Sequence, residues 1–174
     1  LAPWRVKLIA YDPYVDEAKF AHSNAKAVDL ETLLRESDVV TIHANLTSET
    51  HYLMNEARFE LMKPSAILIN AARGPIVEEE ALFFALEKQK IAGAALDVFE
   101  TEPLDLQSPL RGLGDKILVS PHMISGNKGA SLKPAVPWTV DNTLAALRGE
   151  LPRHIVNAEA IPLWRKRFGG KNLL

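Results

Sequence analysis

The sequence contains no cysteine, so neither a disulfide framework nor a thiolate metal site can form. It also lacks any apolar run near the roughly 20 residues that a membrane-spanning helix needs. Charges at Arg5, Lys7 and Asp12 distinguish its first segment from a signal peptide. Neither sign of charge dominates, because the net charge is -2 and Lys and Arg are scattered. We therefore expect a soluble, cytoplasmic protein that binds neither nucleic acid nor a membrane.

Several short apolar runs are continuous rather than alternating, which is typical of strands buried on both faces of a sheet. They predict strands over residues 6–11, 39–43, 66–70, 94–98 and 117–120. Helical patterns lie between these runs. Two begin at the capping residues Asp29 and Asn55, and two more span residues 77–90 and 134–147. Strands that alternate with helices indicate an α/β fold with a doubly wound parallel sheet.

Asp12 directly follows the first apolar run, so we expect its carboxylate at the carboxyl end of a strand, where parallel sheets bind ligands. A carboxylate there can accept hydrogen bonds from both ribose hydroxyls of adenosine. It would also repel the additional phosphate of NADP, which favours NAD. The alternative is that Asp12 and Pro13 only begin a turn, and this residue alone does not decide between the two.

Five segments of the sequence lie on or directly after the predicted strands. They are 1–14 (LAPWRVKLIAYDPY), 41–50 (TIHANLTSET), 69–75 (INAARGP), 95–103 (ALDVFETEP) and 119–122 (VSPH). Together and in this order they resemble the D-isomer-specific 2-hydroxyacid dehydrogenases, over residues 1–157. The resemblance implies a homodimeric, NAD-dependent oxidoreductase. Such an enzyme interconverts a small D-2-hydroxyacid and its 2-keto acid by hydride transfer.

In that family a glycine-rich GxGxxG turn between the first strand and the first helix holds the cofactor pyrophosphate. The sequence begins beyond this turn, so the resemblance implies an N-terminally truncated, Rossmann-like fold. We expect a partial NAD-binding domain over residues 1–150 and a C-terminal tail over residues 151–174. The strand before the turn lies at the centre of the family's sheet. We therefore expect these residues to fold poorly alone or to belong to a longer polypeptide.

Reducing a 2-keto acid requires a cation for the carboxylate, a proton donor for the developing alkoxide and a rigidly held nicotinamide. The resemblance assigns the first role to Arg73. Its guanidinium presents two parallel N–H groups to a carboxylate, which lysine cannot do. Gly74, the next residue, lets another backbone segment approach closely. The alternative is a surface arginine beside a turn glycine.

His122 is the expected acid and base, because imidazole titrates near neutral pH. The resemblance pairs it with Glu102, and a carboxylate within hydrogen-bonding reach favours the protonated imidazole and fixes which ring nitrogen faces the substrate. The two residues lie twenty positions apart, so their contact depends on the fold. Glu100 is the competing carboxylate, and Glu102 is preferred because it directly precedes Pro103. Formate dehydrogenases of the same superfamily carry glutamine there, so the glutamate favours a hydroxyacid enzyme.

The resemblance also assigns residues to the cofactor. Asp97 is expected to orient the nicotinamide by accepting a hydrogen bond from its carboxamide; its alternative role is to form a turn at the end of a strand. His43, Asn45 and Thr47 belong to a passage beside adenosine and ribose, with Asn45 where proline is usual. The full cofactor-binding set is Asp12, His43, Asn45, Thr47, Ala71, Arg73, Asp97 and His122. No ligand spacing indicates a metal site.

Other functions stay open at this point. A non-enzymatic, NAD-sensing interaction protein, like the corepressors related to this family, would carry the same residues, and so would an inactive fragment. A different Rossmann-type protein, such as a methyltransferase, would use Asp12 on a ribose but leave Arg73, Glu102 and His122 unexplained. NAD-dependent partner binding without turnover would distinguish the corepressor type from the enzyme.

Overall fold

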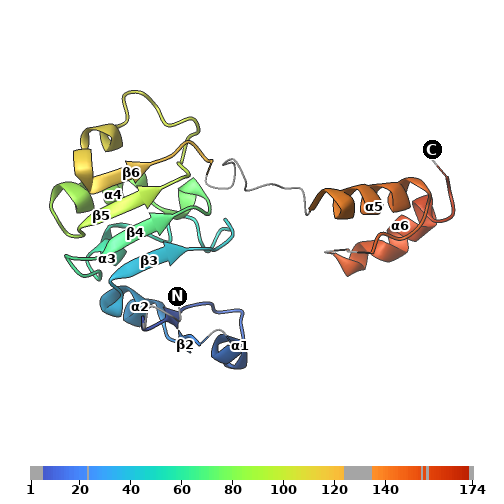
Figure 1. Cartoon of the computed structure of the whole chain (residues 1–174), viewed down its shortest axis with the longest axis horizontal. Helices are drawn as coiled ribbons and strands as arrows, with labels where there is room; N and C mark the ends of the chain where they lie inside the picture. The colour runs from blue at the N-terminus through green and yellow to red at the C-terminus, as the bar shows by residue number, and fades with distance from the viewer. Residues whose placement is uncertain (1–5, 23, 124–134, 154, 156, 173–174) are drawn as a thin grey trace. The chain divides into compact units, whose positions relative to one another are not determined.

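The computed structural model describes residues 6–22, 24–123, 135–153, 155 and 157–172. Two compact units divide the chain, Leu1–Ile124 and Ser125–Leu174. In the first unit strands and helices alternate (Figure 1). Its strands are β1 (Ile9–Ala10), β2 (Lys26–Ala27), β3 (Val39–Ile42), β4 (Ile67–Asn70), β5 (Gly93–Leu96) and β6 (Ile117–Val119). Its helices are α1 (Glu17–His22), α2 (Leu30–Glu36), α3 (Glu56–Phe59) and α4 (Glu79–Glu87), with the 3-10 turns η2 (Gly74–Ile76), η3 (Pro109–Gly112) and η4 (Gly114–Lys116).

Strands β3 to β6 form one parallel sheet in chain order, and β1 pairs in parallel with β2 in a separate sheet. A helix or 3-10 turns lie in the connection between each successive pair of strands, as parallel pairing requires. The predicted α/β fold with a parallel sheet is therefore confirmed. The sequence did not predict β2, and β1 is shorter than the predicted run of 6–11. The paired strand covers only Ile9–Ala10, so the ends of that run lie outside the sheet, and Val6 and Tyr11 are both exposed.

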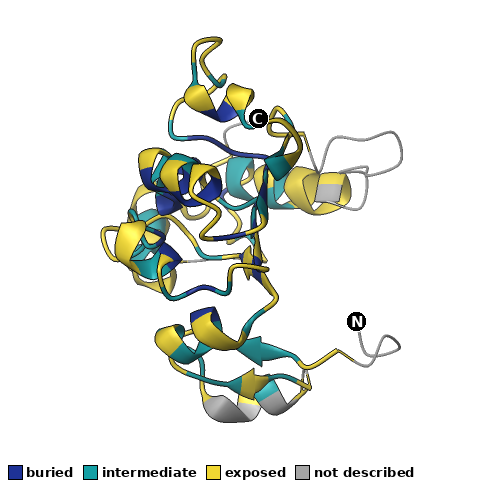
Figure 2. Ribbon diagram, turned by 90° about the vertical axis from the view of Figure 1, so that its left-hand side faces the viewer, coloured by how far each residue is buried: buried dark blue, intermediate teal, exposed yellow. Residues whose placement is uncertain are grey.

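One face of the four-stranded sheet is buried, and the opposite face is largely accessible in the described residues. Along β3, Val40 and Ile42 are buried, whereas Val39 is 54% exposed. In β4, Leu68 is buried and Ile67 is 42% exposed. The expectation of strands buried on both faces is therefore wrong for these residues. Side chains of α2, α3 and α4 share the core with the buried face, and Figure 2 shows the buried residues gathered there.

Helix α4 places its residues 81, 82, 85 and 86 in the core, at the spacing of one helix face. Leu82 and Leu86 are fully buried, and burial of a leucine contributes about 1.5–3 kcal/mol. The helix is shorter than the predicted 77–90. It begins after Val77 because that residue bridges to Met54, and it ends before Gln89, whose φ of 56° is left-handed.

Two helices begin at the capping residues that the sequence predicts. The Asp29 side chain accepts a hydrogen bond from the Thr32 N–H at 2.8 Å, and the Asn55 side chain accepts one from the Arg58 N–H at 3.3 Å. Each such cap stabilises its helix, because it satisfies a backbone N–H that has no partner within the helix. The second of these helices, α3, ends at Phe59.

The second unit contains α5 (Ala135–Leu147), the 3-10 turn η5 (Ala158–Ala160) and α6 (Ile161–Phe168). The segment after α5 folds back on this helix, and the Arg153 N–H donates a hydrogen bond to the Asn142 side chain at 3.2 Å. Helix α6 lies in the predicted tail, where no helix was predicted, and Pro162 occupies its first turn. The predicted domain boundary at residue 150 stays a prediction.

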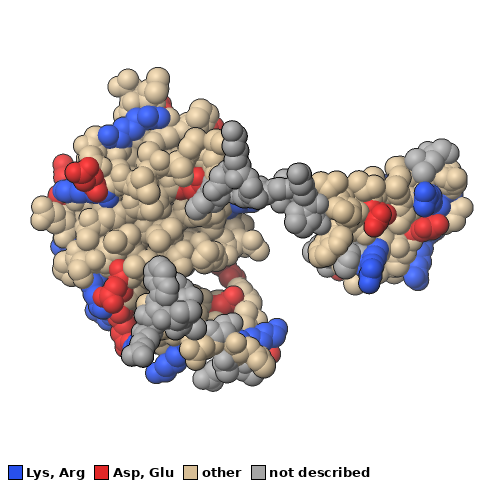
Figure 3. Space-filling model, viewed as in Figure 1, with Lys and Arg blue, Asp and Glu red and all other residues tan. Residues whose placement is uncertain are grey.

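Charges of both signs are interspersed on the face drawn in Figure 3. The exposed ion pairs contribute little to stability, because water and salt screen them. Their N to O distances are 2.6 Å for Lys7–Glu36, 2.7 Å for Lys63–Asp38 and 3.0 Å for Lys90–Glu60. Within the described residues we find no helix with the length and hydropathy of a transmembrane span.

Candidate functional site

The carboxyl ends of β4, β5 and β6 bring the predicted catalytic segments to one edge of the sheet. Asn70 ends β4 and leads into the Arg73 turn, Asp97 follows β5, and Ser120 follows β6 before His122. The strands are adjacent and parallel, so their carboxyl ends meet, as they do at ligand sites of open α/β sheets. The topology therefore explains why residues far apart in sequence become neighbours.

His122 contacts Glu102. The distance from its Nδ1 atom to Oε2 of the carboxylate is 2.7 Å, and both side chains are partly exposed. The other carboxylate oxygen, Oε1, accepts the Phe99 N–H at 3.1 Å. These two bonds lower the pKa of Glu102 below its ordinary value of 4.5, with the His122 hydrogen bond as the larger cause. Because Nδ1 is used by Glu102, Nε2 is the ring nitrogen that can face a substrate.

Arg73 lies in a turn that Asn70 organises. The buried Asn70 side chain donates to the Arg73 carbonyl at 2.9 Å and accepts the Ala72 N–H at 3.1 Å. The guanidinium of Arg73 is exposed, and its Nη1 donates to the Ala72 carbonyl at 2.7 Å. Ala71 lies in the same turn and is half-buried. The role of Asn70 was not predicted; its only sequence signal is a polar residue at the end of an apolar run.

Gly74 joins the Arg73 turn to the segment that carries Glu102. A Cβ atom at Gly74 would lie 1.8 Å from the Phe99 carbonyl oxygen and 2.6 Å from the Glu100 nitrogen, closer than atoms can approach. The expectation of a close backbone approach at this glycine is confirmed. Only glycine allows the two loops to come this close. The contact brings the Arg73 turn next to the segment that carries Glu102.

Asp97 is buried at the end of β5. Its Oδ1 atom accepts the Ser120 hydroxyl at 2.5 Å and the Met123 N–H at 2.9 Å. The carboxylate thus holds the two flanks of the turn that carries His122. Neither this contact nor the part played by Ser120 was predicted, because neither follows from local spacing. The predicted bond to a nicotinamide carboxamide stays a prediction.

Glu100, the competing carboxylate, makes different contacts. Its Oε1 accepts the Glu79 N–H at the start of α4 at 2.7 Å, and its Oε2 accepts the Tyr52 hydroxyl at 3.0 Å. In return the Glu79 carboxylate accepts the Glu100 N–H at 2.6 Å. Burial, followed by the charge of Glu100, raises the pKa of Glu79, while the hydrogen bond to Glu100 partly opposes that rise. Glu100 therefore fixes the loop to α4, and Glu102 is the carboxylate that contacts His122.

Asp12 lies exposed just beyond β1, as predicted, and its Oδ1 accepts the Tyr14 N–H at 2.9 Å. This bond forms the turn that the sequence indicates as the alternative role of Asp12. The Tyr14 hydroxyl contacts the Glu49 carboxylate, which links the Asp12 turn to the loop after β3. Asp12 also lines a cavity of about 320 Å³ with Phe20 and Val28.

The loop after β3 carries the other predicted adenosine residues. His43 is exposed, and its Nε2 lies 3.1 Å from the Thr41 hydroxyl. Thr50 organises the loop, since its hydroxyl donates to the Asn45 carbonyl at 2.6 Å and accepts the Thr47 N–H at 2.8 Å. The Tyr14 contact brings this loop and Asp12 to the same region. The described residues contain no cluster of three metal-ligating side chains.

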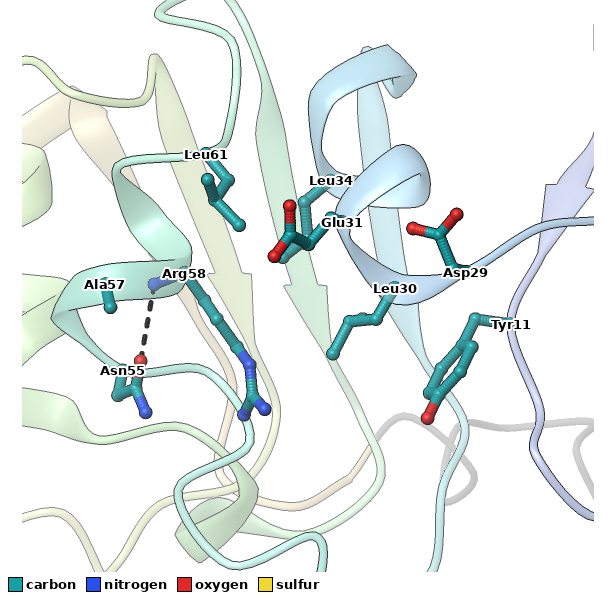
Figure 4. A pocket seen from close by; sticks show the side chains of 9 residues that line it. All are labelled: Tyr11, Asp29, Leu30, Glu31, Leu34, Asn55, Ala57, Arg58 and Leu61. Carbon is teal, nitrogen blue, oxygen red and sulfur yellow. Dashed lines mark hydrogen bonds between the residues drawn. The ribbon is translucent and has the colours of Figure 1, made fainter.

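A cavity of about 750 Å³ opens between α2 and α3 (Figure 4). Leu30 and Arg58 face it from the two helices, and Tyr11 borders it beside β1. None of the predicted catalytic or cofactor residues lines this cavity. The candidate site is therefore the strand-end cluster around His122 and Glu102 and not this cavity.

Comparisons with known proteins identify the family of this chain. Residues 1–123 match the family model described as "D-isomer specific 2-hydroxyacid dehydrogenase, NAD binding domain". Glyoxylate reductase of Thermofilum pendens is 43% identical over 162 residues, which cover 92% of this chain and 47% of the relative. Glyoxylate/hydroxypyruvate reductase B of Shigella boydii is 47% identical over 134 residues, which cover 77% of this chain and 41% of the relative.

Solved structures show the same relationship and confirm the Rossmann-like fold. A D-lactate dehydrogenase from Sporolactobacillus sp. superposes with a TM-score of 0.77 at 32% identity, over 90% of this chain and 50% of that one. The NAD complexed form of a D-isomer specific 2-hydroxyacid dehydrogenase from Lactobacillus delbrueckii ssp. bulgaricus gives 0.76 at 29% identity, over the same shares of the two chains. The chain spans about half the length of these relatives. Because the family model matches well over half of its residues, the chain belongs to the D-isomer specific 2-hydroxyacid dehydrogenase family, as part of its NAD binding domain.

Proposed function

We propose that this chain forms the NAD-binding part of an oxidoreductase that interconverts a small D-2-hydroxyacid and its 2-keto acid. The observation that carries the proposal is the 2.7 Å contact between His122 Nδ1 and Glu102 Oε2, beside the Arg73 turn. The pair combines an imidazole, which can donate or accept a proton, with a carboxylate that holds it in one orientation. Membership of the family supports the same reaction.

In the reducing direction each of these side chains has a distinct role. The Arg73 guanidinium binds the substrate carboxylate through two parallel N–H groups. Protonated His122 donates a proton from Nε2 to the ketone oxygen, which becomes the hydroxyl of the product. Glu102 stabilises the imidazolium before transfer and keeps Nδ1 turned away from the substrate. Bound NADH supplies the hydride that the carbonyl carbon receives.

The chain's own residues suit the adenosine and nicotinamide ends of such a cofactor. The exposed Asp12 carboxylate can accept ribose hydroxyls, and its charge disfavours the additional phosphate of NADP. The proposed contacts beside the adenosine are His43, Asn45 and Thr47. Those beside the nicotinamide are Ala71, Arg73, Asp97 and His122. The buried carboxylate of Asp97 supports this assignment, because it lies at a strand end among the proposed catalytic residues.

The substrate class, the assembly and the location belong to the same proposal. Two relatives are named glyoxylate or hydroxypyruvate reductases and another is a D-lactate dehydrogenase, so we propose a short-chain 2-keto acid as substrate. The homodimer, the cytoplasmic location and the lack of nucleic acid or membrane partners stay predictions.

The direct test is an assay of NADH oxidation by the natural polypeptide that carries these residues. Glyoxylate, hydroxypyruvate and pyruvate serve as substrates, and chiral chromatography identifies the enantiomer formed from hydroxypyruvate and pyruvate. We expect turnover with at least one of them and only the D-product. Arg73→Lys keeps the charge but not the planar fork, so it should raise KM for the keto acid by on the order of tenfold. NAD binding without any turnover would instead support the non-enzymatic, NAD-sensing function.

A further inference from the structure

His122 has an unusual backbone conformation. Its φ is 53°, in the left-handed region that residues with a Cβ atom rarely adopt. Such a conformation costs free energy, so the surrounding contacts must hold it. Glu102 holds the imidazole ring but makes no contact with the His122 backbone among the hydrogen bonds of the described residues. Other groups must therefore fix the turn itself.

The contacts that fix the turn converge on one oxygen atom. Oδ1 of the buried Asp97 accepts the Ser120 hydroxyl at 2.5 Å and the Met123 N–H at 2.9 Å. These donors lie two residues before and one residue after His122. Both ends of the strained turn are thus anchored on one carboxylate, and the Asp97 backbone is itself held to the end of β4, since its N–H donates to the Asn70 carbonyl at 3.0 Å.

Ser120 uses each of its polar groups in this arrangement. Its N–H donates to the Leu96 carbonyl at 2.9 Å and continues the pairing of β6 with β5. Its carbonyl accepts the His122 N–H at 3.1 Å and closes a three-residue turn around Pro121. Its hydroxyl reaches Asp97. The first two contacts use the backbone and tolerate any side chain, whereas the third requires a hydroxyl at this position.

We propose that Ser120 is a positioning residue for His122, a role that rests on the function proposed above. Its hydroxyl, bound to Asp97, keeps the turn in the conformation that directs Nδ1 to Glu102 and Nε2 toward the substrate. The two carboxylates hold different parts of His122, since Asp97 holds the backbone of the turn and Glu102 holds the ring. Without the hydroxyl, only the Met123 end stays anchored on Asp97, and the imidazole can leave Glu102.

Three variants of Ser120 and one control test this role. Ser120→Ala removes the hydroxyl, and Ser120→Thr restores a hydroxyl at the same position. Ser120→Cys keeps the volume with a much weaker donor, so it replaces the alanine variant if that protein does not fold. The matched control is Ser108→Ala, because Ser108 precedes η3 and its side chain makes no capping hydrogen bond.

The first measurement is NMR of the ring nitrogens of His122 as the pH is varied, which requires no substrate. We expect wild type, Ser120→Thr and Ser108→Ala to show a single tautomer with the proton on Nδ1 at high pH. Ser120→Ala and Ser120→Cys should show a mixture of tautomers. The proposal is overturned if both variants keep the wild-type nitrogen shifts and titration. This result is independent of turnover, so it separates failure of the positioning role from failure of the proposed oxidoreductase.

The second measurement is steady-state kinetics of keto-acid reduction. Loss of orientation affects proton transfer more than carboxylate binding, so Ser120→Ala should lower kcat by on the order of tenfold while KM changes less than twofold or so. Ser120→Thr should recover most of kcat. Equal kcat in the alanine variant and wild type would overturn the proposal, and so would a threonine variant as slow as the alanine one.

Discussion

Gly74 lies directly against Phe99: a Cβ atom on the glycine would stand 1.8 Å from the Phe99 carbonyl oxygen. This approach joins the loop after β4 to the loop after β5, and so places Arg73 near the segment of Glu102. The contact is between backbone atoms, so a larger residue cannot be accommodated by a side-chain rotation.

Gly74→Ala should therefore force the two loops apart. We expect a loss of unfolding free energy of about 1–3 kcal/mol, together with a higher KM for the keto acid because Arg73 moves. Urea denaturation and steady-state kinetics measure the two effects. Gly112→Ala is the matched control, since nothing lies within 4 Å of a Cβ atom there. Equal stability of the two alanine variants would contradict the assignment.

Glu102→Gln tests the charge of the carboxylate that contacts His122. Glutamine keeps the size and an acceptor oxygen but loses the negative charge that favours the imidazolium. We expect a lower kcat for keto-acid reduction, because the imidazolium loses the carboxylate that stabilises it. Glu100→Gln is the control, because Glu100 contacts Tyr52 and Glu79 and not His122. Its kcat should match wild type even if its stability falls.

Glu102 also predicts how stability depends on pH. Its pKa in the folded protein is lowered below the ordinary value of 4.5, so its ionised form stabilises the fold. This stabilisation is present above pH 4.5 and is lost as the pH falls through the lowered pKa of the folded protein. Urea denaturation of wild type and Glu102→Gln between pH 7 and about pH 3 measures it. The difference in unfolding free energy between them should shrink toward acid pH; a difference that stays constant would contradict this role.

Asp12→Asn tests the preference for NAD. Asparagine preserves an acceptor for the Tyr14 N–H, whose present distance to Asp12 is 2.9 Å, but removes the charge that repels the phosphate of NADP. We expect the ratio of kcat/KM for NADH over NADPH to fall by on the order of tenfold. The control is Asp16→Asn, which removes the charge of an exposed carboxylate four residues later and should leave the ratio unchanged. An unchanged ratio in the Asp12 variant would assign the preference to other residues.

The sheet was largely predictable from the sequence, because β3 to β6 are continuous apolar runs. Their predicted bounds differ from the observed ones by no more than two residues. Strand β2 was not predicted, since Lys26–Ala27 is too short to form a pattern. Burial on both faces was also wrong for the described residues, because a run such as Val39–Ile42 has the same apolar composition whether one face or two are covered.

Only the residues of the candidate site that belong to recognisable sequence motifs were predictable. The sequence placed Arg73, Glu102 and His122 at strand ends, and the structure brings Glu102 to His122. The supporting contacts were not predictable, because they join residues far apart in the chain. Ser120 and Asp97 lie 23 positions apart, and no local pattern marks a serine hydroxyl that will meet a carboxylate.

The most direct test of the proposed function is the kcat of His122→Ala for keto-acid reduction with NADH, measured beside wild type and His22→Ala. His22 ends α1 and is exposed, so its variant controls for the loss of any histidine. Removal of the proton donor should lower kcat by about 10²–10⁴-fold while NADH still binds, and His22→Ala should match wild type. A kcat for His122→Ala equal to that of wild type would contradict proton transfer by His122.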